Sequence, residues 1–363
     1  MILLVTVGTA LRDKYGSAGY KNVRQALDEF AEVADGRVVA LDEPDDVNAL
    51  GIPSLAARDP GSILLSIRAI RRQSSGVDSL LIAGGDDVIP FWKMTNPVAD
   101  RVVDPDPVVA TDNPYGTQSE TLEEYLAPQL SVGRLHDYGN GNGQAFVDLI
   151  RAATSFRQER PSRTGSGVVI NSDWSEFGQK AAATLPTPVD WHITPGYVIN
   201  DGTASDTNRA ALYFNLHGFS DQPQWKGYDP IRGQYVTVVA PETFHGRFVS
   251  GSVVFAENCY GAQTIGRTPK NSCALQMVRE GAAFIGASGF AFGSHLVPGM
   301  FLEDADFLAQ AFFSNFWAAR QSLGDALRDA RQQYRDDTHT PMSDPYKQKT
   351  LLQFVLLGDP GWN

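Results

Sequence analysis

Two stretches in the second half of the chain decide the fold: residues 211–218 read ALYFNLHG and residues 252–262 read SVVFAENCYGA. Each begins with a nearly continuous apolar run, which is typical of a strand buried on both faces of a parallel sheet. The first run ends at His217 and Gly218, and the second ends just before Cys259. Because the carboxyl ends of parallel strands meet at one edge of a sheet, we expect these residues to lie close together.

Two further apolar runs in this half, Gly167–Asn171 and Ala282–Gly286, have the same character. The first leads to Asp173, and the second leads to Ser288 and Gly289. The four strand ends are therefore predicted to form a single active-site rim at one edge of the sheet.

The rest of the chain alternates short strands with helices, the pattern of a parallel sheet covered by helices. The remaining strands are expected at Ile2–Val7, Arg37–Leu41, Ser79–Ala83, Leu130–Val132 and Leu352–Leu357. The helices are expected at about Tyr20–Val33, Ser62–Arg72, Gln144–Glu159 and Glu303–Arg335. Residues 84–116, rich in Gly, Pro and Asp, are expected to form a long surface excursion. The polar segment Gln158–Gly167 is the best boundary between two α/β subdomains, residues 1–160 and residues 161–363.

Composition and charge limit the function. The 363 residues include 42 acidic and 30 basic side chains, a net charge of −12, which disfavours binding to nucleic acid or to anionic membranes. No apolar run approaches the roughly 18 residues that a membrane-spanning helix needs. The first residues, MILLVTVGTAL, lack the basic start of a signal peptide, so we read them as a buried strand and expect a cytoplasmic protein.

Cys259 and His217 carry the strongest chemical signal. A thiol is a useful nucleophile only as thiolate, and a nearby imidazole can take its proton near neutral pH. Glycines follow both residues, which lets a substrate carbonyl approach backbone N–H groups. The alternative is a buried structural thiol with a hydrogen-bonded histidine. Cys273, in a capped helical segment, is predicted to be a core residue instead.

Other motifs give weaker indications of function. The chain has no GxSxG elbow, no Walker loop and no HExxH, and the run GNGNG at 139–143 is expected to be a flexible turn. A structural calcium ion is one expectation, from the carboxylates of Asp100, Asp104, Asp106 and Asp112. Among the histidines, we place His245 and His295 near the active-site loops, and we expect the surface to hold His136, His192 and His339.

The two opening stretches resemble the marker blocks of the caspase-like cysteine peptidases of clan CD, a strand ending in His-Gly and a strand ending in Cys. Further segments resemble the gingipain-like family and occur in its order: LLIAGGDDVIP at 80–90, LSVGRL at 130–135, AAFIGASGFAFGS at 282–294 and LLGDP at 356–360. The resemblance covers nearly the whole chain. It implies a caspase/gingipain-like α/β fold, with largely parallel sheets flanked by helices, and a thiol endopeptidase that requires no cofactor and has no metal at its active site.

The resemblance also implies roles for individual residues. Cys259 would be the nucleophile and His217 the general base and acid, and the backbone N–H groups of Gly218 and Cys259 would form the oxyanion hole. Asp173 is the best match for the acidic residue that orients the histidine, although the family has Glu at that point.

The substrate pocket is assigned in the same way. Glu176 is the nearest candidate for the acid that binds a basic P1 side chain, although the spacing is shorter than in arginine-specific members. Phe292 would be an aromatic wall, and Ser288 and Gly289 would offer backbone bonds to an extended substrate. Structural roles are the alternatives: a helix cap for Asp173, a first-turn carboxylate for Glu176 and core packing for Phe292.

These inferences predict a Cys-His endopeptidase that cleaves proteins after Arg or Lys, regulated inside the cell as part of a triggered proteolytic response. Control by an activating or inhibitory protein partner, by a covering loop or by self-processing is expected. The self-cleavage candidates are Arg160, Arg163, Lys226, Arg232, Arg267 and Lys270. The alternatives are a catalytically silent binding or regulatory module on the same fold and a thiol hydrolase or acyltransferase that does not cleave proteins.

Overall fold

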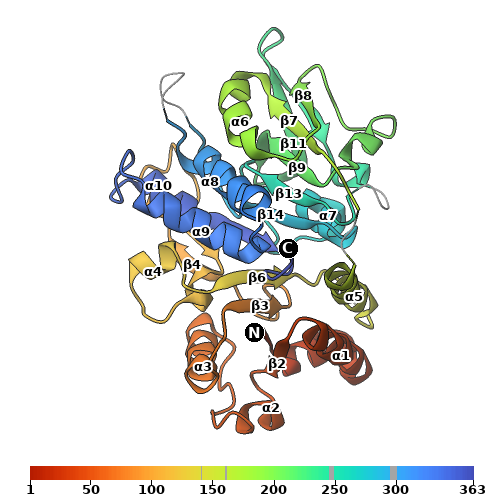
Figure 1. Ribbon diagram of the computed structural model, residues 1–363, viewed down its shortest axis with the longest axis vertical. Coiled ribbons are helices and arrows are strands. Elements are labelled where there is room, and N and C mark those ends of the chain that lie inside the picture. Colours follow the sequence, from red (N-terminus) through yellow and green to blue (C-terminus); the bar gives the residue numbers. More distant parts are fainter. Residues whose placement is uncertain (140, 160–161, 245–248, 295–300) are drawn as a thin grey trace.

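The computed structural model describes residues 1–139, 141–159, 162–244, 249–294 and 301–363. Within these residues, ten strands form one twisted sheet in the order β2-β1-β3-β6-β15-β14-β13-β9-β7-β8 (Figure 1). They are β1 (Ile2–Thr6), β2 (Gly36–Ala40), β3 (Ser79–Ala83), β6 (Ser131–Leu135), β7 (Ser166–Asn171), β8 (Val189–Thr194), β9 (Ala211–Asn215), β13 (Val253–Ala256), β14 (Ala283–Ala287) and β15 (Phe354–Leu357). The predicted architecture, a largely parallel sheet flanked by helices, is confirmed.

Helices cover the sheet, and two small sheets extend from it. The helices are α1 (Gly8–Val33), α2 (Pro44–Asn48), α3 (Pro60–Gln73), α4 (Leu122–Leu126), α5 (Gln144–Gln158), α6 (Ser175–Ala181), α7 (Cys273–Arg279), α8 (Asp304–Phe313), α9 (Leu323–Asp336) and α10 (Pro345–Gln353). The small sheets pair β4 (Trp92–Thr95) with β5 (Val108–Thr111), and β10 (His217–Phe219) with β11 (Gln222–Asp229) and β12 (Gln234–Val239). None of the described helices is both long and apolar enough to cross a membrane.

Strand direction changes once across the large sheet. β15 runs antiparallel to β14 but parallel to β6, so the strands from β2 to β15 in the sheet order point one way and those from β14 to β8 point the other way. Their carboxyl ends consequently lie at opposite edges of the sheet. The pairing of β6 with β15 also joins residues 1–160 and 161–363 into one continuous sheet, and a subdomain boundary near residue 160 stays a prediction.

The core forms two apolar layers because successive strand residues face opposite sides of a sheet. In β9, Leu212 and Phe214 belong to the layer that includes residues of α1, α3, α5 and α7, whereas Tyr213 belongs to the layer of α6, α8 and α9. In β13, Val254 and Phe255 divide in the same way. Burial of such side chains contributes about 1.5–3 kcal/mol each, so both strands are held firmly in the middle of the molecule.

Several details differ from the sequence prediction. The first helix begins at Gly8 rather than near Tyr20, and Gly16, with a φ of 70°, interrupts it. The segment 84–116 is not simply a surface excursion, because it contains β4 and β5 and buries Asp104 and Asp112. The strands β8 and β10–β12 were not predicted, because polar residues break their apolar patterns.

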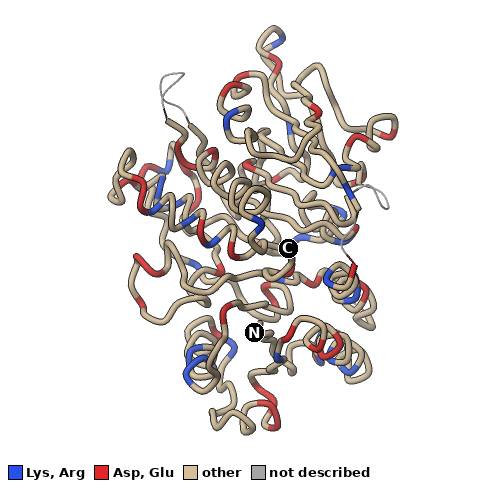
Figure 2. The backbone as a smooth tube through the Cα atoms, viewed as in Figure 1, with Lys and Arg blue, Asp and Glu red and all other residues tan. Residues whose placement is uncertain are grey.

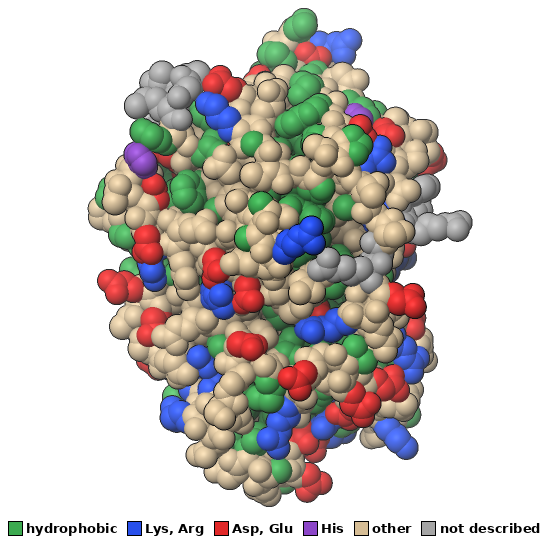
Figure 3. All heavy atoms as spheres, in the orientation of Figure 1, with side chains coloured by type: hydrophobic (Ala, Val, Ile, Leu, Met, Phe, Trp, Pro, Cys, Tyr) green, Lys and Arg blue, Asp and Glu red, His purple; other side chains and the backbone are tan. Residues whose placement is uncertain are grey.

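Charged side chains are spread over the molecule. Figure 2 shows Lys and Arg interspersed with Asp and Glu along the chain in both halves. On the face shown in Figure 3, acidic and basic groups intermingle, so this face carries no extended basic patch of the kind that binds nucleic acid. That the protein binds neither nucleic acid nor membranes stays a prediction.

Candidate active site

Neighbouring strands bring His217 and Cys259 to one edge of the sheet. β9 and β13 are adjacent and in register, with Phe214 opposite Ala256. The pairing continues beyond the strands, because Leu216 N donates to Asn258 Oδ1 at 3.1 Å. His217 and Cys259 consequently line the same cavity, which has a volume of about 550 Å³.

Gly218 lies directly against the backbone of Cys259. A Cβ atom at position 218 would lie 1.8 Å from the Cys259 carbonyl oxygen, far inside any van der Waals contact. Only glycine therefore lets the His217 loop approach the cysteine this closely. This steric fact supplies a structural reason for the His-Gly pair in the sequence.

The Cys259 thiol lies in a tight turn beside the segment that follows β14. Ala291 N donates to Sγ at 3.3 Å, and Sγ lies 3.4 Å from Ala291 O. The next residue, Tyr260, has a φ of 56°, a strained conformation of the kind that concentrates at functional sites. Burial raises the pKa of Cys259 to about 11, and the Ala291 N–H opposes that rise. The resting side chain is consequently a thiol at neutral pH.

Aromatic rings hold the His217 imidazole. Its centroid lies 4.4 Å from that of Trp174 and 4.9 Å from that of Tyr235. Burial lowers the pKa of His217, and the negative charge of Asp173 opposes the shift. The ring is therefore neutral at pH 7 and able to accept a proton. Trp174 and Tyr235 were not singled out in the sequence, where aromatic residues outside the core give no distinct signal.

Asp173 lies in the turn after β7, where its charge reaches His217, but no hydrogen bond joins these two described residues. It is exposed, and its Oδ1 accepts from Ser172 Oγ at 3.3 Å. It does not cap α6, since the residue at the helix start is Trp174 and no side chain caps it. An orienting role for Asp173 stays a prediction.

The residues assigned to the substrate pocket are not among those that line this cavity, and the assignment stays a prediction. Glu176, on α6, has a 52% exposed side chain and pairs with Lys180 at 3.2 Å. Ser288 N donates to Gln353 O, and Gly289 O accepts from Tyr260 N, so these groups bond within the protein. Phe292 packs edge-on against Tyr346 at 4.5 Å. The neighbouring segment does reach the cavity, through Phe290, Ala291, Gly293 and Ser294.

Two buried acids that the sequence analysis missed line the cavity instead. Glu257 and Asp306 share a side-chain hydrogen bond. Tyr213 OH donates to Glu257 Oε1 at 2.5 Å, and Ser294 N donates to Asp306 Oδ2 at 2.6 Å. Burial raises the pKa of Glu257 well above its usual value, and the negative charge of Asp306 raises it further. Burial also raises the pKa of Asp306, to about 6. A signal for Glu257 was present, because it is an acid two residues before Cys259 at the end of a buried strand.

Three of the four aspartates considered for calcium are engaged in ion pairs, whereas Asp100 is exposed and accepts a hydrogen bond from Val102 N. Asp104 and Asp106 both pair with the buried Lys349, and Asp112 accepts two bonds from the buried Arg134. Among the described residues, no group of three or more His, Cys, Asp or Glu side chains is arranged to hold a metal ion. Calcium binding there stays a prediction, and it would have to displace these cations.

The outcomes for the remaining cysteine and histidines are mixed. Cys273 is 2% exposed, and its Sγ donates to Pro223 O at 3.1 Å. His339 is exposed and His192 is half-buried. His136 was expected at the surface, but it is only 4% exposed, because it follows β6 into the interior. His245 and His295 lie outside the described residues.

A thiol and a neutral imidazole that share a cavity at adjacent strand ends of an α/β sheet define the class of cysteine hydrolases. The model of peptidase family C25 matches residues 21–363. The chain therefore belongs to this family, the gingipain family of clan CD, and it is a cysteine endopeptidase. No protein with curated annotation matches the sequence.

Solved structures agree on the fold. The chain is similar to the Arg-specific cysteine proteinase gingipain R, with a TM-score of 0.64 and 10% identity over 99% of this chain and 77% of that one. It is similar to the complex of the Porphyromonas gingivalis RgpB pro- and mature domains, with a TM-score of 0.66 and 9% identity over 100% and 79%. A third structure, described only as a protease, has a TM-score of 0.61 and 15% identity over 99% and 77%.

Proposed function

We propose that this endopeptidase works through a Cys259–His217 dyad and cleaves after basic residues. One observation carries the dyad: Gly218 packs against the Cys259 carbonyl, so the imidazole loop and the thiol loop meet at the same cavity. The thiol and the imidazole follow the ends of adjacent strands, β13 and β9, whose spacing the sheet holds constant.

The electrostatics favour proton transfer during attack over a preformed ion pair. The pKa of Cys259 is raised to about 11 and that of His217 is lowered, so both groups are neutral at rest. His217 takes the thiol proton as Sγ bonds to the scissile carbonyl carbon, and the N–H groups of Gly218 and Cys259 face the resulting oxyanion. His217 then gives the proton to the leaving amine as the C–N bond breaks. Water, deprotonated by His217, hydrolyses the thioester, and the thiolate regains its proton.

The acid pair in the cavity supports specificity for Arg or Lys at P1. Glu257 and Asp306 are buried close together, and burial disfavours their charged forms by raising both pKa values. A guanidinium or ammonium group entering the cavity would offset that cost by pairing with the carboxylates. Glu176, exposed and bound to Lys180, is less suited to this role.

The decisive experiment compares the wild type with Cys259→Ala on fluorogenic peptides varied at P1. We expect cleavage only by the wild type and only after Arg and Lys. Cleavage after other residues would retain the dyad and remove the acid-pair assignment. A wild type that neither cleaves peptides nor reacts with a thiol-directed probe would instead be a silent module. Turnover of thioesters without protein cleavage would identify a different thiol hydrolase.

Regulation in the cytoplasm belongs to the same proposal, through self-processing, a protein partner or a covering loop. Among the self-cleavage candidates, Arg232 lies in the turn between β11 and β12 with a 71% exposed side chain. Arg160 lies outside the described residues. Arg232 and Lys270 are the exposed candidates among the described residues, so these two are presented best to a second molecule. Intact mass that stays constant during incubation of active enzyme would exclude self-processing, and cell fractionation tests the compartment.

A further inference from the structure

A second cavity lies at the opposite edge of the sheet from the catalytic one. Its volume is about 650 Å³, and it receives residues that follow β1, β3 and β6. The chain passes from β1 to β2 on one side of β1 and then to β3 on the other. Such a reversal of strand order is where α/β sheets bind ligands. The motifs GGDDVIP and GRLHD supply its residues, and the peptidase chemistry uses neither motif.

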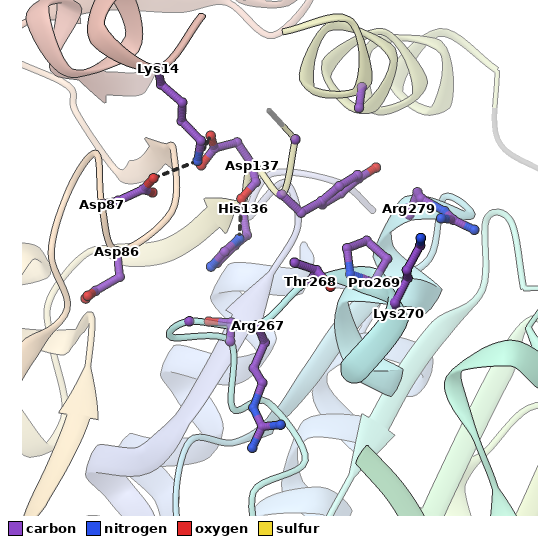
Figure 4. Close-up of a pocket in the computed structure, with 15 residues that line it drawn as sticks. Lys14, Asp86, Asp87, His136, Asp137, Arg267, Thr268, Pro269, Lys270 and Arg279 are labelled. Atoms are coloured by element: carbon purple, nitrogen blue, oxygen red, sulfur yellow. Dashed lines mark hydrogen bonds and ion pairs between the residues drawn. The ribbon is translucent and has the colours of Figure 1, made fainter. Parts of the chain in front are cut away.

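One wall of this cavity is acidic. Asp86 and Asp87 follow β3, and Asp137 follows β6. Lys14 Nζ pairs with Asp137 Oδ2 at 2.7 Å and with Asp87 Oδ2 at 2.8 Å (Figure 4). Three carboxylates facing one ammonium leave this wall with a formal charge of −2. It therefore attracts a cationic group.

A buried histidine adds an acceptor to the same wall. His136 Nδ1 lies 2.8 Å from Asp137 O. A carbonyl oxygen only accepts hydrogen bonds, so Nδ1 carries the proton and Nε2 bears a free lone pair. Nε2 is buried without a hydrogen-bond partner among the described residues. Figure 4 shows the ring between the acidic residues and the segment of Arg267 and Thr268. An unpaired buried acceptor is costly, and a cationic group placed in the cavity beside the ring would stabilise its lone pair.

The facing wall is basic. Lys270 is exposed and has no ion-pair partner within the described part of the chain, and Arg279, at the end of α7, pairs with the neighbouring Glu280 at 3.1 Å. Figure 4 shows Arg279 and Lys270 on the far side of the cavity from Asp86 and Asp87. The cavity is therefore bipolar, with carboxylates and a bare imidazole nitrogen at one end and two cations at the other.

We propose that this cavity binds a small zwitterion of the basic amino-acid type. Its guanidinium or ammonium group would lie against Asp86 and Asp87, beside the His136 ring, and its carboxylate would lie between Lys270 and Arg279. Neither charge alone matches both walls, so recognition requires the two ends together. The inference does not depend on the peptidase specificity, because no residue of the catalytic cavity takes part.

Isothermal titration calorimetry with L-arginine tests this site on the full chain. Cys259 is first alkylated by a peptidyl reagent that also fills the catalytic cavity, so arginine cannot bind there. We expect saturable binding of one arginine. Agmatine, which lacks the carboxylate, and citrulline, which lacks the side-chain charge, should each bind at least roughly tenfold more weakly. Absence of arginine binding, or equal binding of agmatine or citrulline, would overturn the proposal.

Charge reversal locates the binding. Lys270→Glu should weaken arginine binding roughly tenfold or more, because it repels the carboxylate. Lys93→Glu is the matched control, since Lys93 is likewise exposed but lies on β4 outside the cavity. Both changes are at the surface, and unchanged thermal melting checks that both variants fold. Equal affinity of the two variants would place the arginine elsewhere and reject the site.

Discussion

The Cys259 carbonyl oxygen occupies the space that a side chain at Gly218 would need: a Cβ there would lie 1.8 Å from it. The backbone that carries His217 and the backbone that carries Cys259 are thus in direct contact, with no side chain between them. The distance between base and nucleophile is consequently set by main-chain packing, which is more rigid than side-chain packing.

Gly218→Ala should therefore lower kcat/KM by roughly 100-fold, because it forces the two loops apart by about an ångström. Hydrolysis of a fluorogenic peptide measures the loss. Gly196→Ala is the matched control, because the nearest atom to its Cβ would be Ile193 O at 3.7 Å, an ordinary contact. Full activity in Gly218→Ala would show that the loops do not need this contact.

The pH dependence should reveal a neutral pair. Because the pKa of Cys259 is raised to about 11, alkylation of the wild type by iodoacetamide should still be accelerating at pH 9. Because the pKa of His217 is lowered from its ordinary value of 6.5, the base loses its free form only at a lower pH. The decline of kcat/KM on the acid side should therefore have its midpoint below pH 6.5. An alkylation rate that is already constant between pH 6 and pH 8 would indicate a preformed thiolate and contradict this view.

Two acids can be compared directly as determinants of basic P1 specificity. Glu257→Gln should lower kcat/KM for Arg peptides by roughly 10- to 100-fold, because the cavity loses a carboxylate that would pair with the guanidinium. Glu176→Gln should leave it unchanged, because that side chain points to solvent and pairs with Lys180. The reverse pattern would support the assignment of Glu176 made from the sequence.

Arg267 is expected to position the histidine loop. Its Nη2 donates to Ser220 O at 2.5 Å and to Gln263 Oε1 at 3.1 Å, which ties the segment after Cys259 to the segment after His217. Arg267→Ala should lower kcat roughly tenfold with little change in KM. Arg267→Lys keeps a donor and should recover part of the loss. A change in KM alone would assign Arg267 to substrate binding instead.

The buried pair of Arg134 and Asp112 should dominate stability near the centre of the sheet. Arg134 is fully buried and its side chain donates to both Asp112 oxygens, at 2.6 and 2.9 Å. Asp112→Ala leaves that cation unpaired and should cost about 3–5 kcal/mol in denaturant unfolding. Asp100→Ala, at an exposed position, should stay within about 0.5 kcal/mol of the wild type. A similar small loss for Asp112→Ala would mean that water reaches Arg134.

The sequence alone determined the parallel sheet and the placement of His217 and Cys259. Long apolar runs form buried strands whatever surrounds them, and the residues after such strands must gather at one edge. This reasoning is local, so it holds for β7, β9, β13 and β14. It also placed Asp173 near His217, although without a hydrogen bond between them.

Only the tertiary structure decided which side chains line the two cavities. Whether Glu176 or Glu257 faces the substrate depends on side-chain direction and on the burial that α8 imposes through Asp306, and neither follows from spacing along the chain. Likewise, the bipolar cavity joins residues after β1, β3 and β6 with Lys270 and Arg279, which are more than a hundred residues away. Contacts over such separations arise from packing of whole elements, and the local pattern of any one segment does not contain them.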